Sequence, residues 1–211
     1  MSRAAAVAVL ALSAAAWVLT VRQTDGMNMG VATELGSFPF FVAAWVSMMA
    51  AMMLPGAAPA IASFARSDAR ASAVPGFVGS YLAVWAVAGL AVYAFYRPHG
   101  TTVAGTLTIA AGVYELTPLK RECRRRCRAS LRSGFEFGPY CVGSSIGLMV
   151  MLLALGAMSV TWMVAVGAVA LTQKLLPPTA VIDVPLASAI VALGIVAAVA
   201  PSSIHGLTPP M

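Results

Sequence analysis

Charged side chains are scarce in this sequence, and their scarcity excludes a soluble domain. Asp, Glu, Lys and Arg together make up 9% of the 211 residues, whereas hydrophobic residues make up 60%. Soluble domains carry about 25% charged residues. No separate soluble segment remains once the hydrophobic stretches are marked. We therefore predict a single integral membrane domain over residues 1–211, of the all-α class.

The motifs of common enzymes are missing as well. The sequence has no HExxH motif, no GxSxG motif and no phosphate-binding loop, and its two histidines are not at helical spacing. No internal repeat is evident, which argues against a transporter built from inverted halves. The three cysteines all fall where we expect the cytoplasmic side, and thiols stay reduced there. We therefore expect neither catalytic activity nor a structural disulfide.

Seven apolar segments are present, each near the length of about 20 residues that spans a bilayer. They comprise residues 4–21, 38–64, 77–96, 101–118, 141–157, 159–176 and 184–203. The stretch from residue 142 to residue 174 is almost uninterrupted, so either a turn near Gly156 divides it or one long tilted helix reduces the count to six. The first segment could be a signal peptide, but its apolar run exceeds the usual length of about 7–15 residues. We expect a retained helix there and about seven transmembrane helices in all.

The basic residues orient the bundle. With the N-terminus in the cytoplasm, eleven of the 13 basic residues lie on the inner side, as the positive-inside rule expects. Seven of them fall between Lys120 and Arg132, in a predicted basic cytoplasmic loop over residues 119–140. Such a loop attracts anionic lipid headgroups, at about 1 kcal/mol per basic residue. Nucleic-acid binding is not expected of so short a tethered loop.

The second apolar segment has two unlike faces. At about 100° per residue, large side chains fall in one wedge of roughly 140°, and small side chains fall opposite. The wedge holds Trp45, Met48, Met49, Met52 and Met53, and the small face holds Ala43, Ala44, Ser47, Ala50 and Ala51. Small residues favour close contact with another helix. Thioether sulfur is a conformable packing group and also a ligand for Cu(I), so the wedge indicates either packing or a metal site.

Two prolines and one acid complete the membrane-embedded candidates. Pro55 and Pro59 each remove a backbone donor and kink a helix, so the second segment could form a pocket wall, or the kink could only shape the packing. Glu115 lies one or two turns from the cytoplasmic surface. An ionisable group at membrane depth is a functional candidate, although pairing with Lys120 would make it structural.

Further sulfur atoms lie outside the spans. Met27 and Met29 form a Met-x-Met pair in the first outer loop, which could present thioethers to Cu(I) or rest on the membrane surface. Cys123 and Cys127 are four residues apart and would share one face of a helix. With Cys141 they could form a three-thiolate site if the loop folds back. The surrounding arginines should lower the pKa of both thiols and favour the thiolate form.

Two motif groups resemble a known family. The first reads Trp45-x2-Met48-Met49-x2-Met52-Met53-x-Pro55-x3-Pro59; the second reads Tyr114-x-Leu116-Thr117-Pro118-Leu119-Lys120-x2-Cys123-x3-Cys127-Arg128, followed by Tyr140-Cys141-x-Gly143, Leu148-Met149, Gly156-x-Met158, Trp162 and Lys174. Together they resemble an uncharacterised bacterial family of predicted metal-binding integral membrane proteins, over roughly residues 38–176. The resemblance implies a compact bundle of about seven helices in the bacterial inner membrane, with metal binding inferred from Cys and Met content.

This chain departs from the family pattern at its most Cys-rich motif. Ser144, Ser145 and Ile146 stand where the pattern has two further cysteines and a tryptophan, and Gln173 stands where it has an acid. What remains is the Met wedge, Glu115 and the three cysteines.

Two hypotheses follow from these residues. The first is a non-enzymatic membrane protein that handles a soft metal, with copper as the expected metal, as a carrier, membrane chaperone or assembly factor. The second is an accessory subunit that packs its Ala and Gly faces onto a larger membrane protein complex, with methionine as a conformable filler. Both imply a membrane protein partner.

Overall fold

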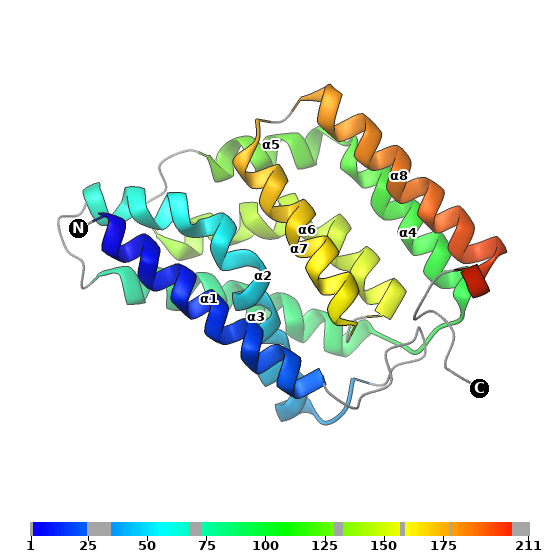
Figure 1. The fold of residues 1–211 in the computed structure, drawn as a ribbon, viewed down its shortest axis with the longest axis horizontal. Coiled ribbons are helices and arrows are strands. Elements are labelled where there is room, and N and C mark those ends of the chain that lie inside the picture. Colours follow the sequence, from blue (N-terminus) through cyan, green and yellow to red (C-terminus); the bar gives the residue numbers. More distant parts are fainter. Residues whose placement is uncertain are drawn as a thin grey trace.

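The computed structural model describes residues 2–24, 35–67, 73–128, 133–156, 159–177 and 179–203. Within these ranges the regular elements are helices and no strand occurs, which confirms the all-α prediction (Figure 1). The elements are α1 (Ser2–Thr24), α2 (Phe38–Ser67), α3 (Val74–Phe95), α4 (Thr101–Glu115), α5 (Pro118–Cys127), α6 (Gly134–Gly156), α7 (Val160–Leu175), α8 (Ala180–Val199) and the 3-10 turn η2 (Pro201–Ser203).

Five of the described helices, α1, α2, α3, α6 and α8, are long and apolar enough to cross a membrane. Two further helices are shorter: α4 has 15 residues, and the apolar helix α7 has 16. At 1.5 Å per residue, such helices cover roughly 23 Å of a hydrocarbon core that is about 30 Å thick. The number of membrane crossings and the orientation of the N-terminus stay predictions.

The long apolar stretch in the second half forms two helices rather than one. α6 ends at Gly156, whose φ of 134° lies in the region that favours glycine. α7 begins at Val160, directly after Ser159, whose carbonyl accepts the N–H of Met163 (2.9 Å). The division therefore falls at the position where the glycine allows the chain to reverse.

The segment expected as a basic loop over residues 119–140 is largely helical, which corrects that prediction. Thr117 caps α5 by accepting the backbone N–H of Lys120, and Pro118 occupies the first turn, as helix starts favour. One face of α5 is buried, and it carries Lys120, Cys123 and Arg124. α6 then begins at Gly134, seven residues before the predicted boundary at 141. The prediction failed because this face is buried by polar pairing rather than by an apolar stripe.

α2 packs against α1, α3 and α7 and is bent near its middle (Figure 1). Pro55 has no N–H to donate to the carbonyl of Ala51, four residues earlier. The hydroxyl of Ser13 on α1 donates to that carbonyl instead (2.8 Å). The small-residue face of α2 thus packs against α1, and the contact satisfies a backbone group that would be costly to leave unpaired in lipid.

α4 and α8 lie side by side, on the side of the bundle opposite α1 (Figure 1). Glycines permit this contact, because a Cβ added at Gly105 would lie 2.6 Å from the carbonyl oxygen of Gly194. Such close approach of helices through small residues is typical of membrane interfaces.

Candidate metal site

The Met wedge of α2 faces the interior of the bundle. Met49 and Met53 are fully buried, and Met48 and Met52 are 5% and 3% exposed. Trp45 is buried beside them, and its indole N–H donates to the carbonyl of Trp85 on α3 (2.8 Å). The thioethers therefore point at neighbouring helices and not outward.

Two sulfur atoms from different helices converge on one ammonium group. Lys174 Nζ on α7 donates to Cys141 Sγ on α6 (2.9 Å) and to Met53 Sδ on α2 (3.4 Å). The hydroxyl of Tyr81 on α3 lies 3.1 Å from the same Cys141 Sγ. Gly56 leaves room for the lysine, because a Cβ there would lie 2.4 Å from Lys174 Cδ. We call Met53, Cys141 and Lys174 the sulfur–lysine cluster.

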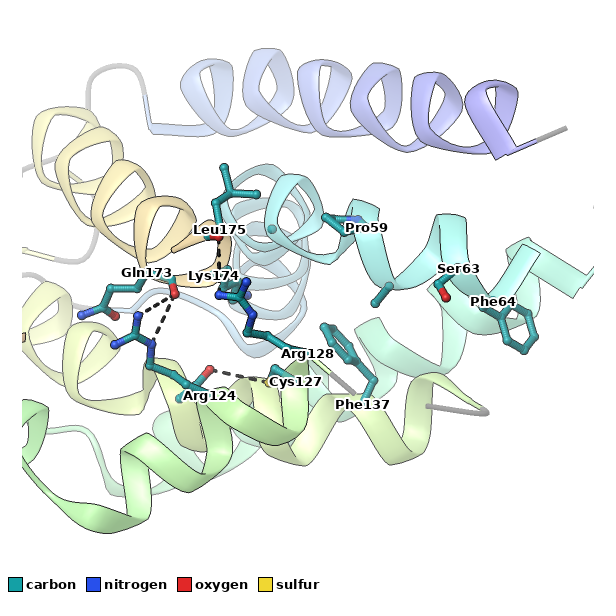
Figure 2. A pocket seen from close by; sticks show the side chains of 13 residues that line it. Pro59, Ser63, Phe64, Arg124, Cys127, Arg128, Phe137, Gln173, Lys174 and Leu175 are labelled. Carbon is teal, nitrogen blue, oxygen red and sulfur yellow. Dashed lines mark hydrogen bonds between the residues drawn. The ribbon is translucent and has the colours of Figure 1, made fainter. Parts of the chain in front are cut away.

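A cavity of about 300 Å³ adjoins this cluster (Figure 2). It lies between the second half of α2, α5, α6 and the end of α7. This is the predicted cytoplasmic end of the bundle. Its lining residues are Gly56, Pro59, Ala60, Ser63, Phe64, Arg124, Cys127, Arg128, Phe137, Ser144, Gln173, Lys174 and Leu175. We call it the basic cavity. The second of the two predicted kinking prolines, Pro59, is thus part of a pocket wall.

The three cysteines occupy separate places. Cys141 belongs to the sulfur–lysine cluster, and Cys127 lines the basic cavity with its Sγ 4.0 Å from Ser144 Oγ. Cys123 packs on Gly143, where an added Cβ would lie 2.7 Å from its sulfur. No group of three or more His, Cys, Asp or Glu side chains suited to a metal ion occurs in the part of the chain that the structure describes. The three thiols therefore do not form one ligand set in this structure.

The protonation of the α5 thiols differs from the expectation. Burial raises the pKa of Cys127 to about 12 and also raises the pKa of Cys123, where the lowering by Arg126 is a smaller contribution. The arginines are engaged elsewhere, since Arg126 pairs with Glu122 (2.9 Å) and Arg124 pairs with Asp183 (2.5 Å). The predicted lowering of the pKa of both thiols is therefore wrong, because burial outweighs the neighbouring arginines.

Comparison with known proteins adds the chemical context. The model of the PpoB2 family, described as copper chaperones, matches residues 42–197. The chain belongs to this family. The match runs from the start of the Met wedge into α8 and includes the whole sulfur–lysine cluster. It supports the metal-related part of the resemblance drawn from the motifs. Neither the curated proteins nor the solved structures gave a match.

Glu115 is part of a buried polar network in this copper-chaperone fold. It pairs with Lys120 of α5 and accepts the side-chain amide of Gln173 (2.5 Å), and Lys120 also donates to Gln173 Oε1 (2.9 Å). Arg124 adds hydrogen bonds to the carbonyl of Gln173 (2.8 Å) and to Asp183. These contacts fasten α5 to α4, α7 and α8, which favours the structural interpretation of Glu115.

Lys174 and Tyr81 were not among the predicted site residues. Lys174 is the last residue of the second motif but has no role assigned by the motif, and Tyr81 lies in an apolar segment without a motif. Only the three-dimensional packing of α3, α6 and α7 brings them to Cys141. Met27 and Met29 lie outside the described residues.

Proposed function

We propose that this protein is a non-catalytic, multi-pass membrane copper carrier that accepts Cu(I) and hands it to a partner. Three observations support the proposal: the copper-chaperone family, five helices of spanning length and apolarity, and a buried line of thioethers. We place it in the bacterial inner membrane, with the N-terminus and α5 on the cytoplasmic side.

The sulfur–lysine cluster carries the proposal. Met53 and Cys141 already hold a cation between a thioether and a thiol, within hydrogen-bonding distance of both. Soft sulfur ligands prefer Cu(I) to an ammonium ion. We infer that Cu(I) takes this position and that Lys174 then turns into the basic cavity that it already lines. The thioether binds without releasing a proton, whereas the Cys141 thiol releases one.

The Met wedge gives the cargo a route through the bundle. A second, much smaller cavity at the opposite end of the wedge is lined by Met48, Met163 and Trp45. From Met48 to Met53 the rise along α2 is roughly 7.5 Å. We propose that Met27 and Met29 receive the ion outside. Met48, Met49, Met52 and Met53 then pass it inward to Cys141 and to the cysteines of α5, Cys127 and Cys123.

Anaerobic measurement of Cu(I) affinity tests this proposal. The purified protein competes with a chromophoric Cu(I) chelator, and the variants are Met53→Leu and Cys141→Ser. Met149→Leu is the matched control, because Met149 is a buried methionine of α6 outside the wedge. Leu and Met exchange with little loss of stability. Both site variants should lose affinity at least tenfold and the control should not. Equal affinity in all four proteins would remove the cluster from the site.

The accessory-subunit hypothesis would need a docking surface outside α2. Both faces of α2 are used inside the chain, since Ala51 is fully buried under α1 and the wedge is buried on the other side. Replacing Met48, Met49, Met52 and Met53 together by Leu separates the two functions. A carrier loses copper delivery to its partner, whereas an accessory subunit retains its function.

A further inference from the structure

We propose that the basic cavity is a binding site for a small anionic thiol, which takes Cu(I) from the sulfur–lysine cluster. This inference rests on the proposed function, and it adds the chemical class of the molecule that removes the cargo at this end of the bundle. It follows from the charge of the cavity, its size and its position beside the two sulfur atoms.

The charge of the cavity is one-sided. Three cationic side chains line it, and none of its described lining residues carries a carboxylate. Arg124 is neutralised by Asp183 and bonded to the carbonyls of Gln173 and Leu176. Lys174 and Arg128 therefore supply the remaining positive charge.

Arg128 is placed to receive a ligand. It is exposed at the edge of the cavity, and among the described residues its guanidinium makes one long hydrogen bond, 3.5 Å, to the carbonyl of Leu175 (Figure 2). A guanidinium has five N–H donors and matches carboxylate geometry well. An anion bound there lies over the same cavity that Lys174 lines.

The volume of the basic cavity and its remaining lining residues further restrict the class of ligand that fits. A volume of about 300 Å³ is at the lower end for small-molecule sites, which suits a ligand no larger than a short peptide. Phe137 and Pro59 provide apolar surface, and Ser63 and Ser144 provide hydroxyl groups. Cys127 presents a sulfur from the wall, so a soft atom of the ligand would meet a soft environment.

Lys174 links the cavity to the metal site. Its stem lines the cavity while its ammonium contacts Cys141 and Met53. A carboxylate bound in the cavity would draw that ammonium toward itself and away from the two sulfur atoms. Lys174 would therefore both bind the anion and be the side chain that moves when Cu(I) and the ammonium exchange places between Met53 and Cys141.

The transfer step is a ligand exchange without a change in oxidation state. As a Cu–S bond forms to the incoming thiol, that thiol releases its proton to solvent. The bonds from copper to Met53 and Cys141 break, and Cys141 takes up a proton. Copper remains Cu(I) throughout, so no oxidant or reductant is required.

The first experiment uses the full-length, copper-free protein in nanodiscs of phosphatidylcholine. Titration calorimetry with S-methylglutathione, which carries the carboxylates but no free thiol, should show saturable binding. Arg128→Gln should weaken it at least tenfold. Arg125→Gln is the matched control, because Arg125 lies on the same helix, is exposed and pairs with Glu122 outside the cavity. Absence of binding, equal loss in both variants, or equally tight binding of inorganic phosphate would overturn the proposal.

The second experiment uses the copper-loaded protein under argon. Reduced glutathione should remove Cu(I) faster than 2-mercaptoethanol, a neutral thiol, at equal thiolate concentration. Arg128→Gln should slow only the removal by glutathione, by about tenfold. Equal slowing of both thiols would overturn the proposal. A protein that binds S-methylglutathione but takes up no Cu(I) refutes the proposed copper function instead, so the two failures are distinguishable.

Discussion

Gly56→Ala tests whether Lys174 competes with copper for the sulfur atoms. The new Cβ would lie 2.4 Å from Lys174 Cδ, whereas carbon atoms pack best at about 3.5–4.0 Å. The lysine stem must therefore move by roughly 1 Å or more. A shift of that size breaks the hydrogen bond from Lys174 Nζ to Cys141 Sγ, which is 2.9 Å long. The backbone of α2 should tolerate the change, because Ala is favoured over Gly in a helix by about 1 kcal/mol.

The expected effect is a gain in copper affinity. Hydrogen bonds from a charged group contribute about 1.5–3 kcal/mol, and tenfold in affinity corresponds to about 1.4 kcal/mol. Removing the competing ammonium should therefore tighten Cu(I) binding by about tenfold or more. Chelator competition measures this, with Gly79→Ala on α3 as the control, since a Cβ there meets nothing within 4 Å. Unchanged or weaker Cu(I) binding in Gly56→Ala would refute the competition between Lys174 and the cargo.

Three further predictions follow from the same contacts. Ser144→Cys places a second thiol beside Cys127, at the present 4.0 Å oxygen–sulfur separation, and should raise Cu(I) affinity in the chelator assay; a second sulfur without effect would show that Cys127 is not a ligand. Burial raises the pKa of Cys127 to about 12, so in the unsubstituted protein the alkylation of Cys127 by iodoacetamide, followed on its own peptide by mass spectrometry, should keep rising about tenfold per pH unit up to pH 10. A plateau near pH 9 would contradict the buried thiol. Glu115→Ala leaves the charge of Lys120 buried without its carboxylate partner, which should lower the free energy of unfolding by about 3–5 kcal/mol. Glu122→Ala, at an exposed and solvent-screened pair, should have a much smaller effect. Equal losses in denaturant titration would contradict the buried network.

The apolar helices could be predicted from sequence because their signal is local. A long run of hydrophobic residues indicates a membrane helix wherever it occurs, and the glycine at position 156 marks the turn between α6 and α7. The wedge on α2 likewise follows from helical periodicity. Periodicity does not reveal which helix covers the opposite, small-residue face, and in this bundle that helix is α1.

α5 could not be predicted in the same way because its burial depends on distant partners. Its inner face carries Lys120 and Arg124, which an apolar-stripe analysis assigns to solvent. Glu115, Gln173 and Asp183 come from three other helices to pair with that face. The predicted direction of the pKa shift of the α5 thiols was wrong for the same reason. Burial of the thiol, and not the neighbouring charges, makes the largest contribution to the shift.

The candidate site combines predicted and unpredicted residues. Met53 and Cys141 were both expected to bind metal, in separate ligand sets on different segments. Both contact Lys174 because of how α2, α6 and α7 pack together. Residue spacing within a single segment cannot predict such a contact between segments.

X-ray absorption spectroscopy of the Cu(I)-loaded protein tests the central claim most directly. The account predicts that sulfur atoms alone surround the copper, and that Cys141→Ser and Met53→Leu each remove one of them. A copper bound mainly by nitrogen or oxygen, or a sulfur shell that neither substitution alters, would contradict it.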